Sequence, residues 1–418
     1  MKKVIISLLV AGAALAANAQ DKALLETLVK KGMLTQQEAA QIAKESVAVT
    51  PAAKSTKSIK IFGGAQGWYS WGKNSLKAGS SQNWSDGQTS GFTLRYVKLG
   101  VEADVGGGWT ATVVTDFGTE GSSKNYLDKV VASKKIDYDY LNGTLQLGLR
   151  KTNMGYEQNM CDFSQLAIER SVATYFFTRD AGKNFGSRTV GVFWDGNIIQ
   201  VEGMYYNLAV TSGVSEGGTD DFITNAQDSS SLSFWAGMGY KNVAEIKGES
   251  LAYDFGLNFG YAPQGATYNK TQKGSVWGIN PYATANWRGF TVIAEYFLQQ
   301  VEDYAERDGC VRTPMGANLT VAYKMDIGEW GAFEPVVRGS YVSTNGLGIH
   351  HYHQYNDKGT LDRTDINQAT TLYIGANWYP TQAIKTSLGY EFGYYDQGNN
   401  AVNRVFGNTV WAQFQVIF

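Results

Sequence analysis

The sequence has no large excess of either positive or negative charge. Beyond its first residues it also has no long apolar run. A formal net charge of −2 gives no electrostatic argument for a nucleic-acid partner. No stretch of about 18 apolar residues follows the N-terminal segment, which argues against a transmembrane helix. A basic surface for nucleic acid and a helical membrane anchor are therefore both disfavoured.

Histidine is also scarce, and the three that exist lie in one segment, at His350, His351 and His353. No Ser-His-Asp arrangement is plausible, because no histidine lies on a predicted strand. A metal site in this segment is disfavoured as well, since no carboxylate or cysteine spacing completes it. The sequence predicts no enzyme, no metal site and no cofactor.

Glycine and aromatic residues are abundant instead, with 48 glycines, 25 tyrosines and 11 tryptophans against only 6 prolines. This balance favours an all-β chain. From Ile59 onward the pattern has a period of two, as in "LQLGLR" (145–150) and "IKTSLGYEF" (384–392). Each such segment predicts a strand with one apolar face and one polar face.

The connections between these strands alternate between short and long. The short ones are predicted at 106–108, 141–143, 195–197, 288–289, 326–331 and 380–382, with a looser one at 241–250. The long ones are predicted near 72–90, 118–129, 152–186, 211–229, 262–273, 300–311, 344–366 and 394–406. Sixteen strands lie between them, and tight turns at one end with long loops at the other are typical of an outer-membrane barrel. We predict an all-β fold, a sixteen-stranded antiparallel transmembrane β-barrel over residues 59–418.

The sequence given ends in the middle of a strand pattern, on "NTVWAQFQVIF" (408–418). Phe414, Val416 and Phe418 share one face of this strand, and glutamines occupy the other. We expect the last strand to pair with the first and outer-membrane lipid to cover the apolar face. The terminal Phe418 resembles the signal by which barrel-assembly machinery recognises its substrates, so this machinery is an expected partner.

The N-terminal part of the chain has a different organisation. A basic start, an apolar run and small residues before the cleavage position predict a signal peptide over residues 1–19. Residues 20–46 have helical spacing interrupted at Gly32, which predicts a short helical hairpin in the periplasm. Residues 47–58 are expected to be a linker. The mature chain is therefore expected to act outside the cytoplasm.

Five stretches resemble the phosphate-selective porins O and P. They are "GFTLRYVKLGVEADVGGGWTATVVTDFG" (91–118), "LQLGLRKTNMGYEQ" (145–158), "IERSVATYFFTRDAG" (168–182), "WGAFEPVVRGSY" (330–341) and "YIGANWYPTQAIKTSLGYEF" (373–392). The resemblance extends along the whole predicted barrel. It implies a water-filled porin of the bacterial outer membrane, a homotrimer, and a third long loop folded into the lumen.

Charged side chains on the inward strand faces and in the third loop are the ones that a solute would meet. The candidates for the pore lining and constriction are Arg95, Lys98, Glu102, Asp116, Arg150, Lys151, Glu169, Arg170, Arg179, Lys183 and Arg338, and strand parity adds Asp104, Glu202, Glu295, Lys385 and Glu391. Opposed charges across a constriction create a transverse field that selects solutes. The basic residues at 95, 150, 151, 170, 179 and 338 match basic positions of the family motifs, which implies an anion path. The alternative for each is an ion pair that pins the loop to the wall.

We therefore expect passive diffusion of small hydrophilic solutes, with a modest anion preference. Two alternatives stay open: a substrate-specific channel for phosphate-like anions or sugars, and a surface barrel that acts through its outer loops. Cys161 of the third loop and Cys310 of the sixth are candidates for a disulfide bridge if the third loop crosses the lumen. Two free thiols are the alternative.

Overall fold

The computed structural model describes residues 58–73, 88–118, 127–178, 185, 188–212, 231–267, 273–303, 310–345, 366–397 and 404–418. The chain divides into two compact units, Met1–Ile59 with Ala103–Thr110, and Lys60–Glu102 with Ala111–Phe418. In the first unit the Asp104 N–H donates to the Ser58 carbonyl at 3.0 Å. Glycines 106–108 in this unit all have positive φ, which a tight turn requires and glycine adopts without strain. The predicted signal peptide, helical hairpin and histidine cluster lie outside the described residues.

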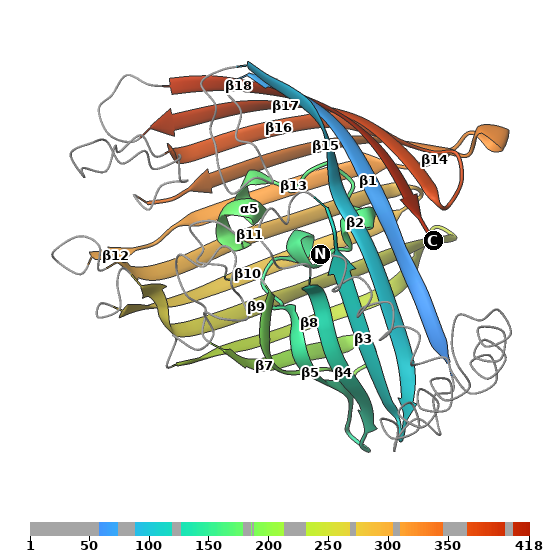
Figure 1. Ribbon diagram of the computed structural model, residues 1–418, viewed down its shortest axis with the longest axis vertical. Coiled ribbons are helices and arrows are strands. Elements are labelled where there is room, and N and C mark those ends of the chain that lie inside the picture. The colour runs from blue at the N-terminus through green and yellow to red at the C-terminus, as the bar shows by residue number, and fades with distance from the viewer. Residues whose placement is uncertain are drawn as a thin grey trace, which may run out of the picture. The chain divides into compact units, whose positions relative to one another are not determined.

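The strands form one sheet, most of it in the second unit, and run antiparallel in chain order (Figure 1). They are β1 (Ile59–Lys73), β2 (Gln88–Gly106), β3 (Trp109–Asp116), β4 (Leu127–Asp137), β5 (Leu141–Lys151), β6 (Arg188–Ile198), β7 (Met204–Ser212), β8 (Leu232–Ile246), β9 (Glu249–Thr267), β10 (Lys273–Trp287), β11 (Phe290–Asp303), β12 (Cys310–Arg312), β13 (Met315–Tyr323), β14 (Met325–Asp326), β15 (Ala332–Ser343), β16 (Ile366–Tyr379), β17 (Ile384–Gln397) and β18 (Arg404–Ile417). A short 3-10 helix, η4 (Gly328–Trp330), lies in the turn before β15.

Three of these strands are pieces of one barrel strand. β12 and β13 both pair with β11, and β13 and β14 both pair with β15. The break between β12 and β13 includes Pro314, which has no N–H to donate to a ladder. Two of the eighteen strands are therefore continuations, and the predicted sixteen-stranded barrel is confirmed.

The barrel closes between its last and first strands. β18 pairs with β1 antiparallel, from Gly64 opposite Ile417 to Lys73 opposite Asn408. Beyond that ladder, Gly63 and Phe418 exchange both backbone hydrogen bonds, each 3.0 Å long. The closing pair predicted from the C-terminal pattern is present, and it leaves the terminal strand without a free edge.

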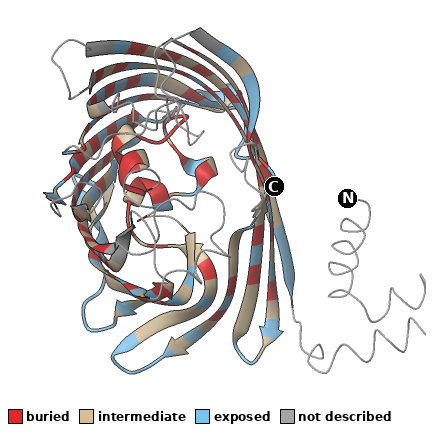
Figure 2. Ribbon diagram, turned by 60° about the vertical axis from the view of Figure 1, so that its left-hand side comes forward, coloured by how far each residue is buried: buried red, intermediate tan, exposed pale blue. Residues whose placement is uncertain are grey.

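Burial along the strands is inverted relative to a soluble barrel, as the alternating colours of Figure 2 show. On β13 and β15, Leu319 and Val337 point outward and are exposed, whereas Asn318, Thr320 and Arg338 point inward and are buried. An outward apolar face is stable only when lipid covers it. Among the described residues, no helix is both long enough and apolar enough to span a bilayer.

Two of the predicted turns are wrong, at 141–143 and 195–197. These residues lie within β5 and β6, where Gly143 stands directly opposite Gly196. A Cβ at Gly143 would meet the Trp194 indole at 2.8 Å, and one at Gly196 would meet the Tyr206 hydroxyl at 2.7 Å. These glycines therefore make room for aromatic rings packed across the sheet. The actual turns lie at 138–140, before β5, and at 199–203, after β6.

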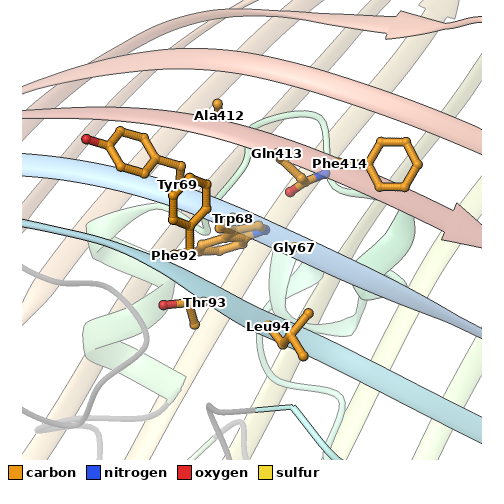
Figure 3. Close-up of a pocket in the computed structure, with 9 residues that line it drawn as sticks. All are labelled: Gly67, Trp68, Tyr69, Phe92, Thr93, Leu94, Ala412, Gln413 and Phe414. Atoms are coloured by element: carbon orange, nitrogen blue, oxygen red, sulfur yellow. The ribbon is translucent and has the colours of Figure 1, made fainter.

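A groove runs along the outer surface beside the closing seam (Figure 3). It has a volume of about 480 Å³ and is lined by Gly67, Trp68, Tyr69, Phe92, Thr93, Leu94, Ala412, Gln413 and Phe414. Tyr69 and Phe92 pack with ring centroids 4.9 Å apart, and Phe92 is 87% exposed. Exposure of this kind at strand faces is what a lipid-facing surface of a barrel requires.

Candidate functional site: the third loop inside the barrel

The chain between β5 and β6, called loop 3 here and described at 152–178 and 185, folds inside the barrel (Figure 2). It contains α4 (Tyr156–Asn159), the 3-10 helix η2 (Asp162–Ser164) and α5 (Val172–Thr178). Loop 3 contacts inward side chains from β1, β2, β10, β11, β13, β15, β16, β17 and β18. This is the inward third loop that the family resemblance implied.

Apolar packing holds α5 to the wall. Ala173, Phe176 and Phe177 form a buried cluster with Phe297, Val342, Ala369 and Tyr395 of the wall. The rings of Phe177 and Phe297 are stacked, with centroids 4.9 Å apart. Each fully buried phenylalanine contributes roughly 1.5–3 kcal/mol. This apolar cluster therefore fills part of the lumen, and strand alternation alone does not predict it.

Asp162 is the centre of the first ionic cluster. Its carboxylate pairs with Lys98 of β2 and with Arg170, and Lys151 Nζ lies 3.9 Å away. Burial by itself raises the pKa of Asp162, but Lys151, Lys98 and Arg170 outweigh it, so the pKa lies well below its usual value. Burial lowers the pKa of Arg170, and the Asp162 charge more than reverses this, so both groups stay charged.

The same cluster continues along the wall through Asp128 of β4. Lys98 Nζ donates to Asp128 Oδ1 at 2.9 Å, and Arg188 of β6 pairs with the same carboxylate. Lys98 also lies 3.8 Å from Asp116 of β3. Four strands and loop 3 are thus tied together by one set of charges.

Arg338 of β15 is the centre of the second cluster. Its guanidinium bonds Glu157 of α4 at 3.1 Å and Glu391 of β17 at 2.9 Å, and it also donates to the Glu169 carbonyl. Burial raises the pKa of Glu157, but Arg338 and the hydrogen bonds from Ser171 outweigh it and lower that pKa. Glu157 therefore joins loop 3 to the wall as a carboxylate.

Glu295 of β11 binds the other side of α4 without a cation. It accepts hydrogen bonds from the backbone N–H groups of Tyr156 and Glu157, and from the side-chain amides of Asn280 and Asn318. Glu295 is buried, and these neutral donors satisfy its carboxylate. It positions α4 on the wall.

The remaining predicted residues have the following places. Arg95 pairs with Glu169 at 2.9 Å, Arg150 pairs with Asp195, and Glu102 accepts from Thr112 at 3.3 Å. Asp116 accepts the backbone N–H groups of Val97 and Gly118, Lys151 donates to the Gln158 carbonyl, and Lys385 donates to the Gln165 carbonyl. Arg179 and Lys183 lie outside the described residues.

Three of the arginines expected in the anion path have instead the geometry of loop-pinning ion pairs. Arg95, Arg170 and Arg338 are only 3%, 5% and 1% exposed. Arg95 and Arg338 each pair with a carboxylate of loop 3 across its contact with the wall. Arg170 pairs with Asp162 inside loop 3 and donates to the Tyr96 hydroxyl of the wall. A guanidinium so enclosed offers almost no surface to a passing solute. The pinning alternative is therefore the one that fits for these three residues.

The disulfide candidate is not supported. Cys161 is a free, exposed thiol. Its segment lies at the turn end of the barrel, where Lys385 near the start of β17 donates to the Phe163 carbonyl at 3.3 Å. Cys310 pairs in register with Asp303, the last residue of β11 at the loop end. The two cysteines lie toward opposite ends of the barrel strands, whereas a bridge needs Cα atoms within about 7 Å.

A cavity of about 630 Å³ lies between loop 3 and the wall formed by β1 to β5 and the end of β18. Its charged lining consists of four cations, Lys98, Lys129, Arg150 and Lys151, and two carboxylates, Asp128 and Asp162. Cys161 and Phe163 of loop 3 also line it. The charged lining of the cavity thus has more cations than carboxylates.

The sequence interpretation missed Asp128, Lys129 and Arg188. Asp128 and Lys129 fell inside the long loop predicted at 118–129, but they belong to β4. Arg188 is the first residue of β6, directly after the predicted loop at 152–186. The signal that the sequence offers for them is a charged residue directly beside a predicted long loop.

The sequence profile of the phosphate-selective porin O and P family matches residues 268–418. Over this segment the chain is similar to that family. Together with the closed barrel, the match identifies an outer-membrane porin. No curated protein matches the sequence.

Solved structures share the fold of this porin. The outer membrane channel DcaP of Acinetobacter baumannii is 13% identical, with a TM-score of 0.55 over 86% of this chain and 97% of its own. OprB of Pseudomonas putida is 11% identical, with a TM-score of 0.59 over 86% and 94%. An anion-selective porin from Comamonas acidovorans is 11% identical, with a TM-score of 0.54 over 86% and 99%. At these identities the similarity establishes the barrel fold.

Proposed function

We propose that this porin is a passive channel for small hydrophilic solutes with a modest preference for anions, which pass through the cavity beside loop 3. The observation that supports this is the charge of the cavity lining, with four cations against two carboxylates. A local excess of positive charge concentrates anions and repels cations. The anion-selective porin of similar fold is consistent with this preference.

The preference is modest because most of these charges are already paired. Lys98 is shared between Asp162 and Asp128, and Arg150 pairs with Asp195. Lys129 and Lys151 supply the excess, since the nearest carboxylate oxygen to Lys151 Nζ is 3.9 Å away. A strict phosphate site would need several convergent unpaired donors.

The proposal includes the assembly of the porin. We place the N-terminal helical segment in the periplasm and Phe418 at the contact with barrel-assembly machinery. We also propose a homotrimer. OmpT of Vibrio cholerae, which is 11% identical with a TM-score of 0.51, is described in a trimer form. The trimer would migrate as one species in native electrophoresis.

Reversal potentials across planar bilayers test the selectivity. The wild type should select chloride over potassium in a salt gradient, and Lys129→Gln with Lys151→Gln should shift the reversal potential toward potassium. Arg288→Gln is the matched control, because Arg288 lies at the β10–β11 turn and is half exposed beside Glu249. An unchanged ratio in the double variant would contradict the cavity as the path.

The same recordings separate the alternatives. Strong interruption of the current by millimolar phosphate would favour the substrate-specific channel over the general one. No conductance from protein that resists SDS until heated would favour the surface barrel that acts through its outer loops.

The native thiol of Cys161 is a second probe, because it is exposed and lines the cavity. In a Cys310→Ser background, an anionic thiosulfonate reagent should modify Cys161 severalfold faster than a cationic one, after normalisation to a free thiol. Modification should also reduce the current. Faster reaction with the cationic reagent would contradict a positive potential in the cavity.

A further inference from the structure

Two tyrosines on a different part of the inner wall converge over a pair of glycines. Tyr205 of β7 stands opposite Gly239 of β8, and Tyr282 of β10 stands opposite Gly256 of β9. Gly239 and Gly256 are themselves a direct cross-strand pair. A Cβ on Gly239 would collide with the Tyr205 phenol, and one on Gly256 would lie 2.6 Å from the Tyr282 hydroxyl. The phenol ends of Tyr205 and Tyr282 therefore pack directly against the backbone of the wall.

This arrangement produces an aromatic surface inside the lumen. The hydroxyls of Tyr205 and Tyr282 meet above the glycine pair and are hydrogen-bonded to each other. Tyr156 of loop 3 then packs on Tyr282, with centroids 4.9 Å apart and an angle of 31° between the rings. The three tyrosines, called the tyrosine shelf here, are all partly exposed. At a strand spacing of about 4.8 Å, the span from β7 to β10 is about 14 Å.

Polar groups border the shelf on the side of the turns. Tyr205 Oη donates to Asp254 Oδ1 at 2.6 Å. Lys241 stands opposite Asp254 in register, is exposed, and has its Nζ 5.5 Å from the Tyr205 ring centroid. One carboxylate and one ammonium give this border no net charge, in contrast to the cation-rich cavity.

We propose that the tyrosine shelf is a binding subsite for neutral sugars, which stack a pyranose ring on the tyrosines and hydrogen-bond its hydroxyls to Asp254 and Lys241. The inference rests on the proposed function, because the sugar must enter the lumen. Aromatic faces give ring-shaped ligands contact area, and a few fixed polar groups orient them. A neutral polyhydroxylated ring matches a shelf with balanced charges, whereas an inorganic anion has no face to stack.

Aromatic rings also cover glycines on the outer face of the barrel, where Trp194 packs over Gly143 and Tyr206 packs over Gly196. Those rings face away from the lumen. The shelf differs because its rings lie on the solute side and because loop 3 adds a third ring to it. If Tyr205 had only a structural role, replacing it would lower the stability of the barrel without changing how sugars interrupt the current. The two roles can therefore be distinguished by experiment.

Single-channel recordings of the full-length porin test the proposal with maltotriose as the probe. A polyethylene glycol of the same hydrodynamic size is the control for simple occlusion. Maltotriose should interrupt the current more often and for longer than the polymer does. Tyr205→Leu and Tyr156→Leu should each remove this excess, whereas Tyr205→Phe should retain most of it, since the ring remains.

Tyr240→Leu is the matched control, because Tyr240 is on β8 but packs outward against Tyr253 and Phe255. It should leave the maltotriose effect unchanged. If Tyr205→Leu fails to assemble, Tyr156→Leu decides alone, since Tyr156 belongs to loop 3 and not to a strand. The subsite is overturned if maltotriose and the polymer interrupt the current equally. It is also overturned if the excess effect of maltotriose persists in Tyr156→Leu and Tyr205→Leu. Neither result would contradict the proposed porin function. An absence of all current would overturn the proposed function and the subsite together.

Discussion

Arg338 illustrates how strongly one residue can determine the interior of this porin. Its side chain is fully buried, and it is bonded to Glu157 at 3.1 Å and Glu391 at 2.9 Å. A buried charge is tolerated only when it is paired and hydrogen-bonded. Two carboxylates from different elements depend on this single guanidinium.

We predict that Arg338→Met weakens the docking of loop 3. Removing one member of a buried pair costs about 3–5 kcal/mol, because the remaining charges stay buried without a partner. The temperature at which the folded form converts to the unfolded form in SDS should therefore fall. Arg288→Gln is the control, because its ion pair is half exposed with a 3.5 Å separation and contributes at most about 1 kcal/mol. Equal conversion temperatures for the two variants would contradict the role of Arg338.

The pH dependence of loop docking should follow Asp162. Its pKa is held well below the usual value of about 3.9 by Lys151, Lys98 and Arg170. The stabilisation is therefore fully present above about pH 4 and is lost as the pH falls through the folded-state pKa. The SDS conversion temperature of the wild type should be flat from pH 7 to about 4 and fall below that. Asp162→Asn should start lower and lose much of this acid dependence, and a steep wild-type decline near pH 6 would contradict the assignment.

At the scale of elements, the pairing of strands β5 and β6 depends on two glycines that stand opposite each other, Gly143 and Gly196. A Cβ on Gly196 would collide with the Asn142 carbonyl and lie 2.7 Å from the Tyr206 hydroxyl. We predict that Gly196→Ala destabilises the barrel by about 1–3 kcal/mol through overpacking. Gly339→Ala is the control, because a Cβ there meets nothing within 4 Å, and its change should stay within about 0.5 kcal/mol. Urea unfolding in detergent measures both, and equal midpoints would contradict the packing argument.

Loop 3 is the element in which prediction from sequence was least complete. Its position inside the lumen followed from the family resemblance, because nothing local in "TNMGYEQNM" (152–160) indicates where the segment docks. The charged residues of the loop could be named from the sequence, but their partners could not. Glu169 and Arg170 are adjacent in sequence and bond to Arg95 and Asp162 instead. Pairing across a lumen depends on which strands the loop reaches.

At the scale of the whole molecule, Phe418 extends the closing pair of the barrel by one residue. Phe418 exchanges two 3.0 Å backbone hydrogen bonds with Gly63, and its ring would lie 3.0 Å from a Cβ at that glycine. We predict that deleting Phe418 sharply reduces the fraction of protein that reaches the membrane in a heat-modifiable form. Phe414→Leu on the same face is the control and should assemble normally, since it keeps an apolar group toward lipid. Normal assembly of the deletion would contradict a role for the terminal residue.

The sequence by itself determined the barrel. Strand alternation places Leu319 and Val337 toward lipid and Asn318 and Arg338 inward. This pattern can be recognised from neighbouring residues alone, because successive side chains of a strand point to opposite faces. Loop lengths and the terminal strand likewise fixed the number of strands and the closing pair. Only the tertiary structure decided what fills the lumen. The ion pairs of Asp162 and Arg338 and the tyrosine shelf join residues from distant strands. Their geometry therefore depends on the barrel register and on the path of loop 3, which no local pattern encodes.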